Sequence, residues 1–463
     1  MGVIISPHRN TPAVPRENKE KESWESLYRR IASARPLAGC RALLAYNSVL
    51  DRVVKLDEGV LSKLPKPSGS RRPRRVRDLQ DFADALAFSI RHNIAMEVVC
   101  EQNVFTHISK LGPYREQIGG QTAIITNLLS KFQRSVVIVH ADRFDARAAA
   151  LYRRTKALVA LPSHDGMRVV PAEKFVEEVE PEAHYIFEYG SGTEFASGRA
   201  GRNNRMIACP TTPIVFQADW EEVLPEIAPL VDFAFLAGLN HMGDDYETAF
   251  ARVAEHIRLL RIGNPHITIH LELTSTQELM KLEQILHMVV RKVDSVGLNE
   301  GELLDVMDCL GHMPERGPLG QVEGMLAIMG LGPNRVHLHT MGYNLCKVRG
   351  KEEPARDGML FGALIGAAAA LKGKIPGPRD LDAAMKVPVS ARGVDMLKAF
   401  EQVWLRQDTE ELATKGYLKG FGIAAVPTRV VPKPKGTVGL GDMISSSSLA
   451  AELAFRNLGQ NSL

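Results

Sequence analysis

The amino-acid sequence predicts an α/β protein built on an open, mainly parallel sheet that is covered by helices on both faces. Short apolar runs of strand length alternate along the chain with longer segments whose apolar residues recur at helical spacing. This β-α alternation is typical of such sheets. The chain has 463 residues and no repeat of fixed period, so it is long enough for more than one structural unit. Ligands of such folds bind outside the carboxyl ends of the strands.

The individual elements are predicted from the length of each run and from its spacing. Strands, which are short and apolar, are predicted at residues 41–47, 135–140, 167–170, 183–189, 205–208, 231–236, 266–271, 293–298 and 335–339. Helices are predicted at residues 24–34, 78–91, 121–129, 146–155, 246–260, 275–290, 299–309 and 359–371. The strands at 167–170 and 183–189 are expected to form a small antiparallel unit.

Two segments fall outside this alternation. Residues 1–23 are polar and contain proline, so we expect a loose N-terminal arm there. Residues 64–77 (LPKPSGSRRPRRVR) are rich in proline and arginine. We interpret them as a solvated surface loop, and the alternative is a mobile basic segment near a phosphate.

The composition excludes several classes of protein. A net charge of +3 is too small for this length to indicate nucleic-acid binding. The five cysteines are dispersed and form no Cys-x-x-Cys pair, which argues against a disulfide framework or structural zinc and for a reducing compartment. The longest apolar run, at 359–371, has 13 residues and is too short to span a bilayer. The start of the chain lacks the apolar core of a signal peptide, and we expect a cytoplasmic protein with no membrane partner.

A glycine-rich turn near the C-terminus is the first candidate for chemistry. Gly436, Gly439 and Gly441 lie within six residues, and glycine costs roughly 0.5–1 kcal/mol in a helix or strand interior. Helical spacing follows, so the turn opens a helix with Asp442 at or just before its first turn. Such a place favours an anion, and a carboxylate beside an anion site suits phosphoryl transfer, because it can take the proton of an attacking hydroxyl. The alternative is an aspartate N-cap after a flexible loop.

Two acidic motifs follow successive predicted strands. His270 and Glu272 end the strand at 266–271 and point to the same side, because strand side chains alternate; a strand running out into solvent is the alternative. Asn299 and Glu302 follow the next strand and have the spacing of a helix capping box, which also explains them. Mg²⁺ is often bound by one or two carboxylates plus substrate phosphates. With Asp442, three carboxylates are thus expected at one rim of the sheet.

Other polar residues give weaker signals. His339 and Thr340 end a strand and could contact a base or ribose, or could be ordinary core or surface residues. Arg205 could meet a phosphate or begin a strand as a solvated side chain. Gly120 and Gln121 allow a backbone to approach a ligand, or simply start a helix. The sequence contains no P-loop pattern and no protein-kinase signature set, which excludes the other common phosphoryl-transfer sites.

Taken together, these motifs resemble those of one enzyme family. His270-Leu271-Glu272, Asn299-Glu300-Gly301-Glu302 and Gly439-Leu440-Gly441-Asp442 occur in the order of the HxE, NxxE and GxGD motifs of the ADP-dependent glucokinases and phosphofructokinases, which are members of the ribokinase superfamily. The resemblance covers roughly residues 40–458. It implies a ribokinase-like fold over residues 24–463, with a large Rossmann-like domain and a smaller α/β lid inserted at roughly 48–77 and 160–200. Closure of the lid would expel water.

The resemblance also implies a role for each matching residue. Asp442 would be the catalytic base, with Gly439 and Gly441 shaping the anion hole. The residues implied to contact magnesium are Glu272, Glu302 and Asp442. Those implied to contact ADP are Asn299, His339, Thr340, Val431, Gly441 and Arg205, the last through a phosphate. Those implied to contact the sugar are Asp51, Glu97, Gly120, Gln121, His184 and Asp442.

Two departures from the family pattern stand out. Val49 occupies a place where the family commonly has a second asparagine shortly before the aspartate, which puts one sugar contact in doubt. The arginine-rich stretch from Arg71 to Arg75 is not a family pattern. The carboxylate of Glu97 favours glucose, because it can accept hydrogen bonds from a hydroxyl and would repel a phosphate.

The function that the resemblance implies is transfer of the β-phosphoryl of ADP to a sugar with Mg²⁺, giving AMP, in a modified glycolysis. Glucose is the expected acceptor and fructose 6-phosphate the second. One alternative is a 6-phosphofructokinase only. Others are an ATP-dependent ribokinase-type kinase and a non-catalytic sugar- or nucleotide-binding relative. We expect a monomer or small homo-oligomer with no nucleic-acid partner.

Overall fold

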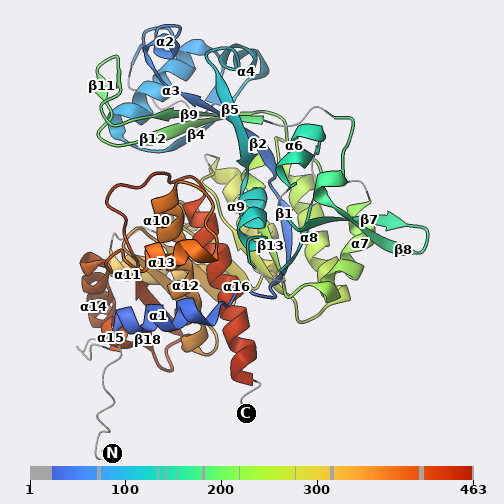
Figure 1. Ribbon diagram of the computed structural model, residues 1–463, viewed down its shortest axis with the longest axis vertical. Coiled ribbons are helices and arrows are strands. Elements are labelled where there is room, and N and C mark those ends of the chain that lie inside the picture. Colours follow the sequence, from blue (N-terminus) through green and yellow to red (C-terminus); the bar gives the residue numbers. More distant parts are fainter. Residues whose placement is uncertain are drawn as a thin grey trace, which may run out of the picture.

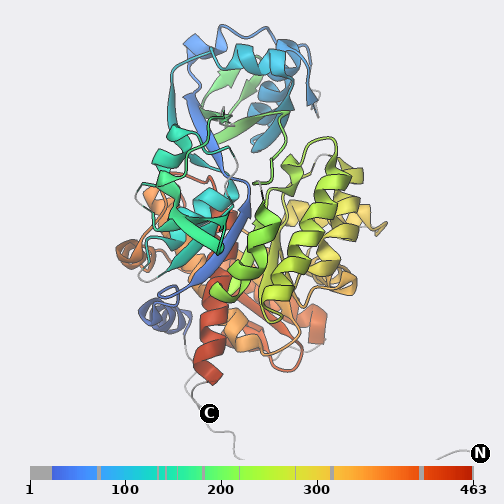
Figure 2. The same ribbon diagram turned by 90° about the vertical axis from the view of Figure 1, so that its right-hand side faces the viewer.

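Two sheets divide the protein into a large and a small unit, and the small unit lies at one end of the molecule in both views (Figure 1, Figure 2). The computed structural model describes residues 23–69, 75–132, 135–140, 143–153, 155–179, 183–217, 219–276, 278–312, 317–405 and 411–460. The loose arm expected at residues 1–23 thus lies almost entirely outside the described residues.

The large sheet has eleven strands within the described residues, in the order β18-β19-β17-β16-β15-β14-β13-β1-β6-β7-β8. The strands from β16 to β7 pair in parallel, and antiparallel strands close both edges. Their bounds are β1 (Arg41–Tyr46), β6 (Val136–Val139), β7 (Ala157–Ser163), β8 (Gly166–Pro171), β13 (Phe233–Ala237), β14 (Thr268–Glu272), β15 (Ser295–Leu298), β16 (Arg335–His339), β17 (Tyr343–Val348), β18 (Tyr417–Leu418) and β19 (Ile423–Pro427). The parallel order brings the carboxyl ends of the central strands to one edge, as predicted.

Helices cover both faces of this sheet. The face toward α12 receives Phe233 and Phe235, and the opposite face receives Ala234 and Leu236, because side chains alternate along β13. Helices on the α12 side are α1 (Trp24–Ala34), α5 (Gln121–Leu129), α12 (Glu352–Lys372), α13 (Leu381–Ala384) and α16 (Leu440–Gln460). Helices on the opposite side are α7 (Trp220–Ile227), α8 (Tyr246–Gly263), α9 (Leu279–Met288), α10 (Glu300–Cys309), α11 (Pro318–Leu331), α14 (Ala391–Leu405) and α15 (Glu411–Lys415).

Several short elements connect these layers. They are α6 (Ala146–Leu151) and the 3₁₀ turns η1 (Ala172–Lys174), η2 (Ala228–Leu230), η3 (Leu239–His241), η4 (Val290–Lys292) and η5 (Pro378–Asp380). None of the helices in the described part of the chain combines the length and the apolar character that crossing a bilayer requires.

The small unit is a six-stranded sheet in the order β3-β4-β12-β9-β2-β5, with helices on one face. Apolar side chains such as Phe187 and Met206 pack against α3 and α4, whereas Asp51 and Arg205 alternate with them and belong to the opposite face. The elements are β2 (Val49–Lys55), α2 (Glu58–Leu61), β3 (Arg75–Val76), α3 (Leu79–His92), β4 (Met96–Cys100), α4 (Gln102–Ile108), β5 (Tyr114–Gly119), β9 (Ala183–Tyr189) and β12 (Asn204–Pro210). Between β9 and β12, β10 (Glu194–Phe195) and β11 (Gly198–Arg199) pair with each other in a separate two-stranded sheet.

The structure corrects the predicted boundaries of this unit. The sheet is built from residues 49–119 and 183–210, whereas the lid segments were expected at 48–77 and 160–200. The expected antiparallel unit of 167–170 with 183–189 is wrong: β8 pairs with β7 at the edge of the large sheet, and β9 pairs with β2 and β12 in the small one. Alternation of apolar residues identifies a strand, but it does not identify the sheet that the strand joins.

The basic segment at 64–77 lies partly outside the described residues, which omit 70–74. Its last part forms the short strand β3, in which the Arg75 guanidinium lies 2.6 Å from the Glu101 carboxylate. That part of the segment is therefore paired with a neighbouring carboxylate.

Candidate active site

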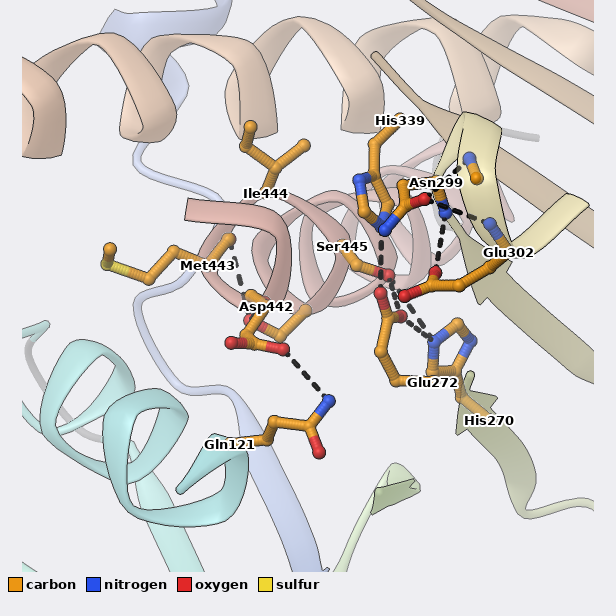
Figure 3. Close-up of polar contacts among 12 residues, drawn as sticks. Gln121, His270, Glu272, Asn299, Glu302, His339, Asp442, Met443, Ile444 and Ser445 are labelled. Carbon is orange, nitrogen blue, oxygen red and sulfur yellow. Dashed lines mark hydrogen bonds and ion pairs between the residues drawn. The ribbon is translucent and has the colours of Figure 1, made fainter. Parts of the chain in front are cut away.

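Polar residues from the carboxyl ends of the parallel strands meet the N-terminus of α16 (Figure 3). Glu272 ends β14, Asn299 caps the helix after β15, and His339 ends β16. Asp442 lies in the first turn of α16 and faces the same region. The structure therefore brings together three motifs that are spread over 170 positions of the sequence, from residue 272 to residue 442.

Glu272 is the centre of a buried hydrogen-bond network. Its Oε1 accepts from His339 Nε2 at 2.8 Å, and its Oε2 accepts from His270 Nε2 at 3.0 Å and from Ser445 Oγ at 2.6 Å. Ser295 lies behind His270, with its hydroxyl 2.8 Å from His270 Nδ1. Three donors from three different elements therefore fix the orientation of this carboxylate.

The network sets the charges of its members. Burial alone would raise the pKa of Glu272, but the hydrogen bonds from His270 and His339 outweigh it and lower the pKa to about 2. Burial lowers the pKa of His270, which therefore stays neutral. Burial also opposes the charge of His339, yet its hydrogen bond to Glu272 raises its pKa above the ordinary value. Glu272 is consequently ionised throughout the physiological range.

This network extends beyond the residues that the sequence motifs contain. Arg335 Nη1 donates to Ser295 Oγ at 3.0 Å, and Arg335 Nε donates to Glu452 Oε2 at 2.8 Å, both in the interior. Gly297, on the strand beside Glu272, leaves the necessary space: a Cβ there would lie 2.0 Å from Glu272 Oε2. Arg335 and Ser295 are polar residues inside predicted apolar strands. This contrast was the one sign in the sequence that they take part in the network.

Glu302 combines a structural and a potential metal-binding role. It completes the capping box that its spacing predicts, because Asn299 N–H donates to Glu302 Oε2 at 2.8 Å and Glu302 N–H donates to Asn299 Oδ1 at 3.1 Å. Burial raises the pKa of Glu302 to about 8, and the charges of Glu272 and Asp442 add to that rise. Glu302 therefore lies close enough to both carboxylates to be affected by them.

Asp442 is held at the start of α16. Gln121 Nε2 donates to Asp442 Oδ1 at 3.0 Å, and the first backbone bond of the helix runs from Met443 N–H to Gly439 C=O at 3.0 Å. The N–H groups that precede this bond lie at the positive end of the helix dipole. Gly439 has φ +67°, which favours glycine, and a Cβ on Gly441 would lie 3.0 Å from His339 Cε1. Burial, with the charge of Glu272, raises the pKa of Asp442 to about 6.

The expected sugar contacts lie on the polar face of the small sheet and at its junction with the large unit. Asp51 is buried, and burial raises its pKa to about 6 against the charge of His184. The two residues are directly opposite each other on β2 and β9. Gly120 has φ +75° and fits against Asn47, whose backbone oxygen would be 2.5 Å from a Cβ there. Val49, the departure from the family pattern, is a buried residue that begins β2.

Glu97 lies farther along the same face. Its Oε1 accepts from Asn240 Nδ2 at 3.1 Å and lies 3.4 Å from His241 Nε2. Asn240 and His241 follow β13 in the turn η3. The sequence reasoning missed both, although the rule applied to the other strands, that polar residues past a carboxyl end belong to the site, would have found them.

The remaining expected nucleotide contacts have structural partners of their own. Arg205 Nη1 donates to Thr437 Oγ1 at 3.1 Å, which places its guanidinium against the glycine-rich turn. Thr340 Oγ1 donates to Tyr343 C=O at 2.7 Å and closes the turn between β16 and β17. Val431 packs partly buried against the core beside α12. Of these three, only Arg205 is shown beside the turn that begins α16.

The side chains present are compatible with a divalent cation. Glu272, Glu302 and Asp442 oppose one another's charge in a buried place, and a cation relieves that repulsion. The donors are carboxylate oxygens, which Mg²⁺ prefers. Because both Glu272 oxygens already accept hydrogen bonds, Glu302 and intervening waters would provide much of the coordination.

Fold and site together define a phosphotransferase of the α/β class. Comparison with known proteins then gives the family. The conserved region of the ADP-specific phosphofructokinases and glucokinases matches residues 40–451, and the chain belongs to that family. This confirms the α/β fold with a large, mainly parallel sheet and the ADP-dependent sugar kinase activity that the motifs implied.

Relatives of both specificities resemble the chain over nearly its full length. An ADP-dependent glucose/glucosamine kinase of Pyrococcus furiosus is 30% identical over 94% of this chain and 99% of its own. An ADP-specific phosphofructokinase of Methanosarcina acetivorans is 28% identical over 95% of this chain and 98% of its own. A solved ADP-dependent kinase in complex with fructose 6-phosphate and ADPβS matches with a TM-score of 0.81 and 26% identity, over 93% of this chain and 98% of its own.

Proposed function

We propose that this kinase transfers the β-phosphoryl of ADP to a hydroxyl of glucose, releasing AMP, with Mg²⁺ as the resident cation. The observation that carries the proposal is the convergence of Asp442, Glu272 and Glu302 at the N-terminus of α16 (Figure 3), where the charges of Glu272 and Asp442 raise the pKa of Glu302 and the charge of Glu272 raises the pKa of Asp442. Such an arrangement supplies a base, a cation site and an anion site within one small volume.

The residues divide the reaction among them. Asp442 accepts the proton of the attacking hydroxyl, and the N–H groups that begin α16 hold the transferred phosphoryl group. Arg205, held against Thr437, supplies positive charge beside the same turn. Gln121 orients Asp442 through its 3.0 Å hydrogen bond. When bound, Mg²⁺ would neutralise phosphate charge, and Glu272 and Glu302 would hold it.

The acceptor follows from the polar face of the small sheet. Asp51 and Glu97 place two carboxylates there, which suit sugar hydroxyls and oppose a phosphate. Fructose 6-phosphate is the second candidate, because the similar kinase with a TM-score of 0.81 holds it. Glucosamine joins the panel because the Pyrococcus furiosus relative is named for it.

A coupled assay of the purified chain tests the proposal. Glucose, glucosamine and fructose 6-phosphate are each supplied with ADP and, separately, with ATP. We expect turnover with ADP and glucose, with AMP as the product. Turnover of fructose 6-phosphate alone would overturn the acceptor, and turnover with ATP alone would overturn the donor.

Glu302→Gln tests the proposed cation site. The amide keeps the side-chain size and an oxygen for the capping box but removes the charge, so the Mg²⁺ concentration for half-maximal activity should rise by about tenfold or more. Asp308→Asn, an exposed substitution on the same helix, is the control. An unchanged Mg²⁺ requirement in the Gln variant would leave Glu302 with its capping role alone.

The acid limb of the pH profile follows from two aspartates. Burial raises the pKa of Asp442 and of Asp51 to about 6 each. At saturating Mg²⁺, which would keep Glu302 ionised, both aspartates act ionised in the proposed reaction, so activity is present above pH 6 and is lost as the pH falls through 6. Log kcat/KM for glucose should fall with a slope greater than one, and with a slope near one in Asp51→Asn. A flat profile across pH 6 would contradict the assignment.

The small unit and the cysteines support two further proposals, on the movement of the enzyme and on its compartment. We propose that the small unit acts as a lid, because its polar face carries the sugar contacts and its other face is packed on α3 and α4. The five cysteines all lie in the described residues and form no disulfide with one another, which supports a reducing compartment such as the cytoplasm.

A further inference from the structure

A cluster of nitrogen and sulfur donors lies beside the expected sugar contacts. His184 on β9, Cys209 on β12 and His241 in η3 each present one ligand atom, and these atoms all lie within 4.8 Å of one another. The two imidazole rings have their centroids 5.2 Å apart. Glu97 Oε1 is 3.4 Å from His241 Nε2. Three donor side chains of two chemical types therefore surround one point, and Glu97 contacts one of them, His241.

We propose that His184, Cys209 and His241 form a binding site for a thiophilic divalent cation, Zn²⁺, with water in the fourth position, and that Zn²⁺ bound there inhibits the kinase by occupying the sugar subsite. The site is distinct from the carboxylates proposed for Mg²⁺. The metal-binding part depends only on the geometry of these three residues. The inhibitory part rests on the proposed function, because His184 and Glu97 are its expected sugar contacts.

The donor set fits zinc and excludes magnesium. Zn²⁺ binds four ligand atoms in a tetrahedron, at about 2.0–2.3 Å from the metal, and takes them from thiolate, imidazole and carboxylate groups. The ligand atoms of His184, Cys209 and His241 lie within 4.8 Å of one another, so they are close enough to bind the same ion. Mg²⁺ requires oxygen ligands in a near-octahedral arrangement. A site made mainly of imidazole and sulfur therefore selects a borderline or soft cation. Binding requires the Cys209 thiol to lose its proton to solvent.

The location explains why zinc would act on the enzyme. Cys209 and His184 are buried in the small sheet, whereas His241 follows β13 of the large sheet, so the cation would join the two units. A cavity of about 120 Å³ borders Glu97 and His241 and provides space for a small ion beside the cluster. A bound cation would hold the side chains that the sugar requires, and excess sugar would oppose it.

The three ligand residues are dispersed in the sequence, at positions 184, 209 and 241. Their spacing matches no metal-binding motif, so the absence of a Cys-x-x-Cys pair had argued against structural zinc. That argument concerns local motifs only. The present site is assembled by the pairing of β12 with β9 and by the turn after β13.

Metal binding is tested on the full chain with Co²⁺ as a spectroscopic substitute for Zn²⁺. We expect a thiolate-to-cobalt charge-transfer band in the near ultraviolet, which Zn²⁺ displaces at one equivalent. Cys209→Ser and Cys209→Ala should both lose this band. Cys100→Ser is the matched control, because Cys100 is a buried cysteine of the adjacent strand β4 that packs in the apolar core of the small unit; it should retain the band. Absence of the band in the unsubstituted protein, or its survival in both Cys209 variants, would overturn the site.

Inhibition is tested by sugar kinetics in excess Mg²⁺, with each variant compared with its own metal-free rate. Zn²⁺ should raise the KM for glucose and leave kcat unchanged, and its half-inhibitory concentration should rise at least about tenfold in Cys209→Ser. Equal inhibition of the two proteins, or a fall in kcat alone, would overturn inhibition through the sugar subsite. If the chain turns over no sugar, the proposed function fails, but the cobalt titration still decides the metal site. Melting curves of the variants show whether each is folded.

Discussion

Replacing Asp442 by Asn is expected to lower kcat by about 10²–10⁴-fold while the protein still folds and binds ADP. Asn keeps the size of the side chain and an oxygen that can accept a hydrogen bond from Gln121. In the unsubstituted protein, Gln121 Nε2 donates this bond to Asp442 Oδ1 at 3.0 Å. It cannot accept the proton of the attacking sugar hydroxyl. Steady-state turnover and ADP titration of the same preparation measure the two effects separately.

Asp442→Asn should also raise the melting temperature of the metal-free protein. A carboxyl group whose pKa is raised to about 6 destabilises the folded state once it is ionised, and this unfavourable contribution is present above pH 6 and lost as the pH falls. The amide removes it at neutral pH. Asp308→Asn, at an exposed position, should change neither turnover nor melting temperature. Near-normal turnover of Asp442→Asn would refute its role as base.

The sequence predicted the part of this site that depends on strand ends. Glu272, Asn299 and Glu302 follow runs of apolar residues, and parallel pairing brings such positions to one edge regardless of their distance along the chain. Asp442 was predicted from another local signal, the glycines that begin α16. In both cases the signal depends on a few neighbouring residues, so it can be recognised in the sequence.

Other parts of the site depend on contacts between distant elements. Gly297 carries no local signal inside a short apolar strand, yet a side chain there would clash with Glu272 on the next strand. Arg335 and Glu452 are polar residues inside a strand and a helix that would each suggest exposure, and their pairing 117 residues apart buries both. A single sequence does not show which residues will face each other across two layers.

The boundaries of the small unit were missed for a similar reason. Its sheet mixes parallel and antiparallel pairs from two separate parts of the chain, with β9 lying between β2 and β12. The run at 167–170 has the composition of a strand in either sheet. Its assignment is decided by β7, which already pairs in parallel with β6 and offers β8 a free edge.

Gly362→Ala is expected to impair both stability and turnover, because the helix that carries Asp442 packs on α12 at this residue. A Cβ on Gly362 would lie 2.0 Å from Ser448 Oγ and 2.6 Å from Ile444 C=O. Gly358 and Gly366 lie one turn away on each side and contact the same helix. A Cβ on Gly358 would lie 2.4 Å from Ser448 C=O, and a Cβ on Gly366 would lie 2.8 Å from Ile444 Cδ1. The three glycines form a groove in which α16 lies, so an added methyl group pushes the two helices apart.

Overpacking of this kind costs about 1–3 kcal/mol of unfolding free energy, and a displacement of about 1 Å near the base can reduce turnover by about 10²-fold. Denaturant unfolding and kcat measure the two losses. Gly330→Ala in α11 is the matched control, since nothing lies within 4 Å of a Cβ there; it should gain about 0.5–1 kcal/mol from helix propensity and keep its turnover. If Gly362→Ala behaved like Gly330→Ala, the position of Asp442 would not depend on close contact between α12 and α16, and the base would have to be held by Gln121 and the glycine turn alone.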